Sequence, residues 1–289
     1  LATSAADVEK AMKAGRIASL IGMEGGHSIG GSLGVLRQMY ALGARYMTLT
    51  HFKNTPWADS ATDKPEHDGL TDFGRDVVRE MQRIGMLVDL SHTSEATMMD
   101  TLAVARAPVI FSHSNARAIN HHTRNASDTV LKALAANGGI IMVNVFPTYV
   151  VEETRQWNAV RAGEKARLEA LYIGEPEAAA KGLKDWEAAH PMPRGAIKDV
   201  ADNIDHIVAV SGIDHVGLGG DFDGVGTTVV GMEDVSTYPA LFAELARRGH
   251  SQADLEKIAS GNMLRVMKAA EAYAAAHRAD PPIESPTAF

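Results

Sequence analysis

The 289-residue chain is 45% hydrophobic and 22% charged, a composition typical of a globular protein with a large core. Its formal net charge of -8 argues against nucleic acid or an anionic membrane surface as a partner, because both are bound through clustered lysine and arginine. No apolar run approaches the roughly 18 residues of a membrane span. Cysteine is absent, so any metal ion must be held by histidine, aspartate and glutamate.

Two helix–strand pairs open the chain. The patterns predict a helix over residues 4–14 and a strand that ends at Glu24, then a helix over 33–42 and a strand that ends at His51. The segment FKNTPWADS that follows is too polar and Pro-broken to continue the strand, so it is expected to form a loop. A carboxylate and an imidazole at strand ends are candidates for chemistry, although a glutamate in such a place can also cap a helix.

A helix is predicted to begin at Thr71 and end at Gly85. In the segment that follows, a short apolar run followed by Ser-His occurs twice. The run MLVDL precedes Ser91-His92, and the run PVIF precedes Ser112-His113, with a helix capped by Ser94 or Thr93 between them. A right-handed crossover makes these strands parallel, so both histidines emerge at the carboxyl end of the sheet, where active sites of parallel α/β folds lie. A lone histidine is more often structural, but paired imidazoles are typical of zinc sites.

The polar loop after His113 carries His121 and His122, which as adjacent histidines are more typical of solvated surface than of metal ligands. Ser127-Asp128 then opens a helix, and the next strand, GIIMVNVFP, runs through Asn144 toward Tyr149.

A charge-rich helical insertion occupies residues 151–191 and would form a lid, an oligomer contact or a solvated flank. The next predicted helix contains His206, which is interpreted as packed or capping, and the strand after it ends near Asp221 and Asp223. Helices and a Pro-rich tail that docks on another element or stays mobile complete the chain over residues 237–289.

Six strand-like runs alternate with helices, which predicts a parallel sheet with helices outside. These runs end near Gly22, Thr50, Leu90, Phe111, Val143 and Leu218. A (β/α)8 TIM-type barrel needs eight strands, so in that reading residues 1–289 form a single catalytic barrel domain whose first two strands are missing. The missing part is then expected to be supplied as a separate N-terminal segment or chain, to be disordered, or to be omitted from the given sequence. An open doubly wound sheet of six strands is the alternative and would need no further piece.

The residues at the strand ends fall into six ordered motifs: IGMEGG, YMTLTHFKNTPWADS, VDLSHTS, FSHSNARAINHHTRN, GIIMVN and HVGLGGDFDG. In this order and at these spacings they resemble the membrane (renal) dipeptidase family of zinc peptidases, from about Ile21 to Val266. The resemblance implies a metal-dependent hydrolase barrel that holds two zinc ions and forms homodimers. It also implies hydrolysis of dipeptides, often with a D-residue tolerated at the carboxyl-terminal position.

By resemblance, Glu24 is the carboxylate that bridges both metals, and His92 and His113 complete the shell of the second metal. The family's first strand carries a His-x-Asp pair that binds the first metal, and no such pair precedes Glu24 here. The first metal keeps only Glu24 and Asp221, so we expect this chain alone to hold at most one zinc.

The resemblance also assigns substrate contacts. His51 resembles the histidine that stabilises the tetrahedral intermediate, and Asp221 the aspartate that handles the proton. Arg124 resembles the arginine that grips the substrate carboxylate, with Tyr149 at a neighbouring substrate-contact position.

The expected function is therefore a zinc-dependent dipeptidase that cleaves L,L and L,D dipeptides with a metal-activated hydroxide. Two alternatives stay open: another metal-dependent amidohydrolase or lactonase on the same barrel, and a catalytically inactive homologue that binds peptides. The compartment is not predicted by the sequence.

Overall fold

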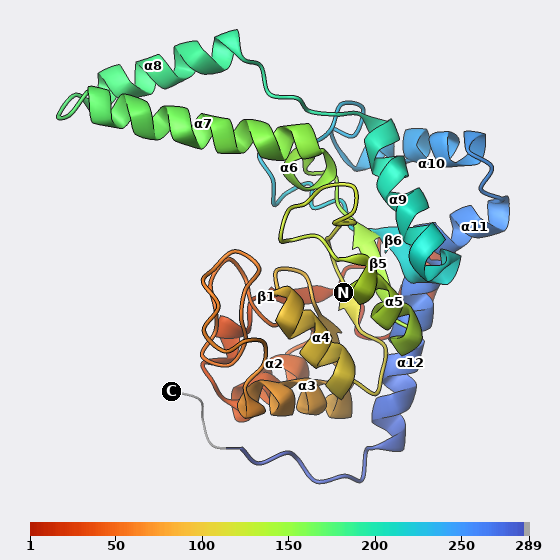
Figure 1. Ribbon diagram of the computed structural model, residues 1–289. Helices are drawn as coiled ribbons and strands as arrows, with labels where there is room; N and C mark the ends of the chain where they lie inside the picture. Colours follow the sequence, from red (N-terminus) through yellow and green to blue (C-terminus); the bar gives the residue numbers. More distant parts are fainter. Residues whose placement is uncertain (286–289) are drawn as a thin grey trace.

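The computed structural model describes residues 1–285 and contains one six-stranded parallel sheet (Figure 1). Its strands are β1 (Ile21–Glu24), β2 (Ala44–Thr48), β3 (Leu87–Asp89), β4 (Ile110–Phe111), β5 (Ile140–Val143) and β6 (Val216–Leu218). They lie side by side in chain order, with β1 and β6 at the open edges. This order is that of a (β/α) barrel, because a doubly wound sheet reverses its strand order at a switch point. The predicted barrel-type α/β architecture is confirmed, and the doubly wound alternative is wrong.

Helices connect the strands and cover the outer face of the sheet (Figure 1). They are α2 (Leu33–Ala41), α3 (Asp72–Ile84), α4 (Glu95–Val104), α5 (Asp128–Asn137) and α9 (Ile197–Ser211). The hydroxyls of Thr71, Ser94 and Ser127 each accept a backbone N–H from the first turn of the helix that follows, as expected of N-caps. Gly85 ends α3 with φ of 87°, a left-handed conformation that glycine adopts without a steric penalty.

Alternate strand residues divide between two apolar clusters. Val88, Phe111 and Ile141 point outward into the main core beneath the helices. The residue before each of them points to the inner face, where Leu87, Ile110 and Ile140 pack against α12 (Asn262–Ala276). These inner residues open their strands, so α12, with α1 (Ala5–Lys13) beside it, closes the amino end of the sheet and leaves the carboxyl end free.

Short helical segments fill the rest of the described chain. They are η1 (Gly26–Ile29), α6 (Pro147–Val150), η2 (Ile213–His215), η3 (Val235–Thr237), α10 (Tyr238–Arg247), α11 (Gln252–Glu256) and the π-helical turn η4 (Lys257–Gly261). The described part of the predicted tail docks on the body: the Ile283 N–H donates to Glu80 Oε2 at 3.2 Å, and Arg37 Nη1 donates to the Ile283 carbonyl at 3.4 Å. The last four residues of the predicted tail lie outside the described residues.

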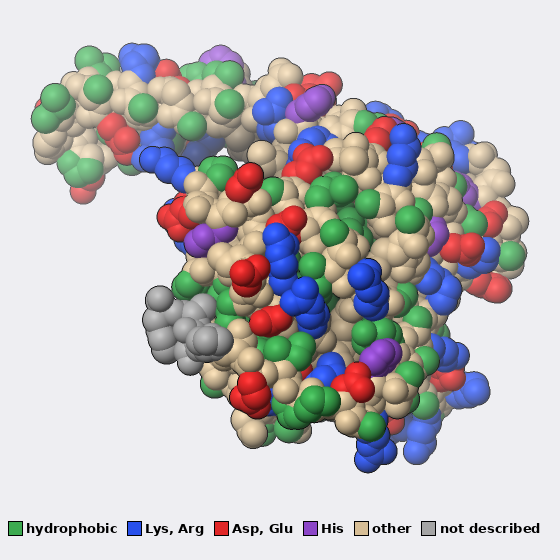
Figure 2. All heavy atoms as spheres, turned by 60° about the horizontal axis from the view of Figure 1, so that its bottom comes forward, with side chains coloured by type: hydrophobic (Ala, Val, Ile, Leu, Met, Phe, Trp, Pro, Cys, Tyr) green, Lys and Arg blue, Asp and Glu red, His purple; other side chains and the backbone are tan. Residues whose placement is uncertain are grey.

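A hairpin of two helices, α7 (Glu152–Leu171) and α8 (Pro176–Ala189), projects away from the body (Figure 1). Its helices pack on each other near its base, where the rings of Trp157 and Trp186 lie 5.7 Å apart, while its tip exposes Leu171 and Ile173. On the face drawn in Figure 2, basic and acidic side chains are interspersed. Within residues 1–285, no helix combines the length and apolarity needed to cross a membrane.

Candidate active site

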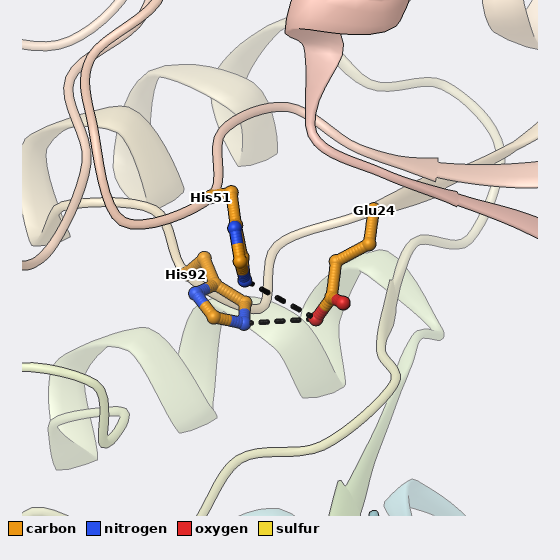
Figure 3. Close-up of side chains that lie close together, drawn as sticks. All are labelled: Glu24, His51 and His92. Atoms are coloured by element: carbon orange, nitrogen blue, oxygen red, sulfur yellow. Dashed lines mark hydrogen bonds and ion pairs between the residues drawn. The ribbon is translucent and has the colours of Figure 1, made fainter. Parts of the chain in front are cut away.

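Three side chains from neighbouring strand ends converge at the carboxyl end of the sheet. The Nε2 atoms of His92 and His113 lie 2.9 Å apart, and Glu24 Oε1 lies 3.0 Å from the first and 3.3 Å from the second. Figure 3 shows Glu24 and His92 turned toward each other from β1 and the turn after β3. The convergence of Glu24, His92 and His113 that the sequence predicts is therefore present.

The three atoms have the spacing of metal ligands. Around a tetrahedral zinc ion with bonds of about 2.0–2.1 Å, ligand atoms lie roughly 3.3 Å apart. The Ser112 hydroxyl lies 2.8 Å from His113 Nδ1, which holds the ring with Nε2 facing the centre. Burial lowers the pKa of His92 to about 3, with Arg124 and His113 adding to the shift, so this imidazole is neutral and able to bind a metal at neutral pH. Hydrogen bonds from His113 and His92 lower the pKa of Glu24 well below its usual range, which keeps it a carboxylate. The donor set thus fits a divalent cation.

His51 belongs to the same cluster. Its Nε2 lies 3.9 Å from Glu24 Oε1, and one ligand atom each from Glu24, His51 and His92 lie within 4.8 Å of one another (Figure 3). Two overlapping triads therefore share Glu24 and His92, and the one completed by His113 is the tighter. A role for His51 beside the ion, as the sequence predicts, and a role as a ligand both fit this position.

The loop from Thr50 to Ala61 contains His51 and forms hydrogen bonds to the backbone of His92. His92 has a left-handed backbone with φ of 72°, which is strained for a residue other than glycine. Its carbonyl accepts the Ala61 N–H at 2.8 Å and the Thr50 hydroxyl at 3.1 Å. The Ser60 hydroxyl donates to the His51 carbonyl at 2.6 Å. The sequence marks this loop by its motif but does not single out Thr50 or Ser60, because their contacts are made across the fold.

A cavity of about 390 Å³ opens beside the cluster. It is lined by Gly22, Glu24, Tyr46, Thr48, Ser112, His113, Gly219, Gly220 and Asp221. Asp221 has φ of 59°, and burial raises its pKa above the ordinary value of 3.8. Tyr46, which the sequence does not reveal as a site residue, lies so close over Gly22 that a Cβ there would come within 2.0 Å of its ring. Glycine at position 22 is thus required for this wall of the cavity.

Arg124 is 1% exposed and lies beside the cluster of Glu24, His92 and His113. Its Nη1 donates to the Ser114 hydroxyl at 3.4 Å, while Nε and Nη2 have no hydrogen-bond partner within the described part of the chain. Its guanidinium carbon lies 5.2 Å from the centre of the Tyr149 ring. A buried guanidinium with free N–H groups is suited to bind a carboxylate.

Two sequence interpretations change in this region, and a third is retained. Tyr149 lies in helix α6 and not along a strand that extends from Asn144, because Pro147 opens a helical turn. His122 is half-buried rather than solvated: its ring lies 4.7 Å from Tyr149, its Nδ1 accepts the Arg124 N–H at 3.1 Å, and burial lowers its pKa to about 4. His206 is packed as expected, with its Nε2 2.8 Å from Asp128 Oδ1.

Comparisons with known proteins agree with this geometry. The model of the membrane dipeptidase family, peptidase family M19, matches residues 1–281. Dipeptidase tcpJ of Claviceps purpurea is 42% identical over 96% of this chain and 57% of its own length, and Dipeptidase 3 of Macaca fascicularis is 40% identical over 99% and 51%. The chain thus spans about half the length of the curated relatives it matches.

Solved structures give the same result. The probable dipeptidase PvdM from Pseudomonas aeruginosa superposes with a TM-score of 0.83 at 29% identity, over 94% of this chain and 74% of that one. A metallopeptidase from Rhodobacter sphaeroides, bound to a phosphinate mimic of the dipeptide L-Ala-D-Ala, gives 0.75 at 25% identity, over 93% and 68%. Family model and relatives agree along nearly the whole sequence, and the chain belongs to the membrane dipeptidase family, peptidase family M19.

Proposed function

We propose that this chain is the catalytic part of a zinc-dependent dipeptidase that hydrolyses L,L and L,D dipeptides. One observation carries the proposal: the Glu24, His92 and His113 cluster lies beside a buried Arg124 whose Nε and Nη2 have no hydrogen-bond partner among residues 1–285. The cluster suits a hydrolytic metal, and Arg124 suits a free carboxylate, the group that every unblocked dipeptide carries. The names of the relatives point to the same substrate class.

Glu24, His92 and His113 would hold the ion, with His51 next to it. Two nitrogen donors and one carboxylate are a ligand set typical of catalytic zinc. When bound, zinc supplies Lewis-acid activation of water and of the peptide carbonyl at neutral pH. The donors that converge here suffice for one such ion per chain.

The other residues act on the substrate. Arg124 would receive its carboxylate through a pair of N–H groups and so fix which peptide bond reaches the cluster. His51 would donate a hydrogen bond to the carbonyl oxygen as negative charge develops on it. Asp221, whose pKa is raised by burial, would accept a proton from the attacking water and pass it to the departing amine.

The test is release of free amino acids by the full protein after removal of metal and after addition of zinc. L-Ala-L-Ala, L-Ala-D-Ala, their carboxyamides and a simple lactone form the panel. We expect zinc-dependent cleavage of both free dipeptides and little cleavage of the amides. Cleavage of the lactone alone would favour the lactonase alternative, and no zinc-dependent cleavage of any substrate would contradict the proposal.

A further inference from the structure

A buried carboxylate beneath the site connects its two histidine-bearing turns. Asp89 is the last residue of β3 and is completely buried. Its Oδ1 accepts the backbone N–H of Ser91 at 3.0 Å and that of Ser112 at 2.9 Å. Ser91 directly precedes His92, and Ser112 directly precedes His113. One carboxylate oxygen therefore fixes the distance between the turns that carry both imidazoles.

The connection continues to the substrate side of the site. The Ser91 hydroxyl accepts the His113 N–H at 2.9 Å and lies 3.3 Å from the Ser114 hydroxyl. Ser114 in turn accepts from Arg124 Nη1 at 3.4 Å. Buried hydrogen bonds thus lead from the Asp89 side of the site to Arg124 in three short steps.

The second oxygen of Asp89 differs from the first in its surroundings. Asp89 Oδ2 is buried and has no hydrogen-bond partner within residues 1–285. A buried carboxylate without compensation is strongly unfavourable. The buried cation nearby is Arg124, whose pKa is lowered by burial, while the negative charge of Asp89 acts in the opposite direction. The charge of Asp89 therefore reduces the cost of burying the charge of Arg124.

We infer that Asp89 is a positioning residue that sets the spacing of His92 and His113 through one oxygen and supports the charge of Arg124 through its carboxylate. The first role, called here the spacing half of the inference, concerns metal binding alone, and the second role is its charge half. The charge half rests on the proposed function, because it assigns to Arg124 the recognition of a substrate carboxylate.

Two substitutions separate the two halves. Asp89→Asn keeps an Oδ1 acceptor for both N–H groups but removes the charge, whereas Asp89→Ala removes both. We expect zinc affinity to stay within about threefold for Asp89→Asn and to fall by roughly 10 to 100-fold for Asp89→Ala, the range typical of residues that orient metal ligands. Competition with a chromophoric chelator measures this without any turnover. Equal affinity for Asp89→Ala and the parent would overturn the spacing half.

Calorimetry with the phosphinate mimic of L-Ala-D-Ala and its carboxyamide tests the charge half. We expect Asp89→Asn to tighten binding of the free acid by about tenfold and to leave the amide within about threefold, because without the Asp89 charge the buried Arg124 is compensated by the carboxylate of the free acid. Asp59→Asn is the matched control, since Asp59 is also buried and accepts the backbone N–H groups of Glu66 and His67.

Equal changes for acid and amide in Asp89→Asn, no change for either, or weaker binding of the acid alone would overturn the charge half. If the parent protein binds acid and amide equally, the proposed recognition by Arg124 fails, and the charge half fails with it. The chelator competition still decides the spacing half in that case. Absence of dipeptide turnover combined with the expected zinc affinities would contradict the proposed function alone.

Discussion

The Nε2 atoms of His92 and His113 lie 2.9 Å apart although the residues are 21 positions apart in the chain. Neutral imidazole has one N–H and one acceptor nitrogen, so two such nitrogens and a carboxylate oxygen cannot all be satisfied by hydrogen bonds among themselves. A cation at the centre of these three atoms would be bound by a lone pair from each of them. The pairing of β3 with β4, with Asp89 opposite Ile110, produces this proximity because equivalent turns follow both strands.

The first prediction concerns metal binding. His92→Gln should lower zinc affinity by more than about 100-fold, because it removes one of the ligands of the tighter triad. The parent should bind one zinc per chain, as measured by chelator competition and elemental analysis. His206→Gln is the control, since His206 pairs with Asp128 outside the cluster. Parent-like affinity in His92→Gln, or two tightly held zinc ions in the parent, would contradict the assignment.

The second prediction concerns carboxylate recognition. Arg124→Lys should raise KM for free dipeptides by about tenfold or more, because an ammonium group cannot form the bidentate fork of a guanidinium. Zinc affinity should change little. Arg117→Lys serves as a control from the same loop, because Arg117 bonds to Glu95 and to the Asn125 carbonyl. An unchanged KM in Arg124→Lys would remove this residue from the substrate site.

The third prediction concerns proton transfer. Asp221→Asn should lower kcat by about 10² to 10⁴-fold with little change in KM, since an amide cannot accept the proton. Because burial raises the pKa of Asp221, activity should be lost as pH falls through a value above the ordinary 3.8. Asp223→Asn, two residues along and exposed, should keep the parent pH profile. Steady-state kinetics across pH decide the matter, and a parent-like kcat in Asp221→Asn would exclude the role.

The fourth prediction concerns acid stability without metal. His92 has a pKa of about 3 in the folded protein, against 6.5 for an exposed histidine. As pH falls below 6.5 the unfolded chain gains a proton that the folded protein does not, so acidification favours unfolding down to about pH 3. Thermal unfolding of the metal-free protein should show Tm falling over this window, with a smaller slope in His92→Gln. His122→Gln should reduce the acid-dependent fall in Tm by a smaller amount, because the contribution of His122 ends near pH 4. Identical slopes in His92→Gln and the parent would refute the burial argument.

Much of this arrangement follows from the sequence because it depends on strand periodicity. Glu24, His92 and His113 each follow a short apolar run, and parallel pairing brings such positions to one edge of the sheet. The contacts that the sequence does not predict depend on the path of a loop and on the register between two strands. Ser60 reaches the carbonyl of His51 within an irregular loop, and Tyr46 lies over Gly22 because the two residues are register partners on β2 and β1. The burial of His122 is likewise not predicted by the sequence, because it depends on Tyr149 in helix α6, where the sequence predicts a continuing strand.

The projecting hairpin provides a natural optical probe. It carries two of the three tryptophans of the chain, Trp157 and Trp186, whereas Trp57 is completely buried in the core. Fraying of α7 from α8 should therefore shift the emission of the hairpin pair while Trp57 keeps the blue emission of an apolar environment. Intrinsic fluorescence of a Trp57→Phe variant would then follow the motion of the hairpin separately from melting of the barrel.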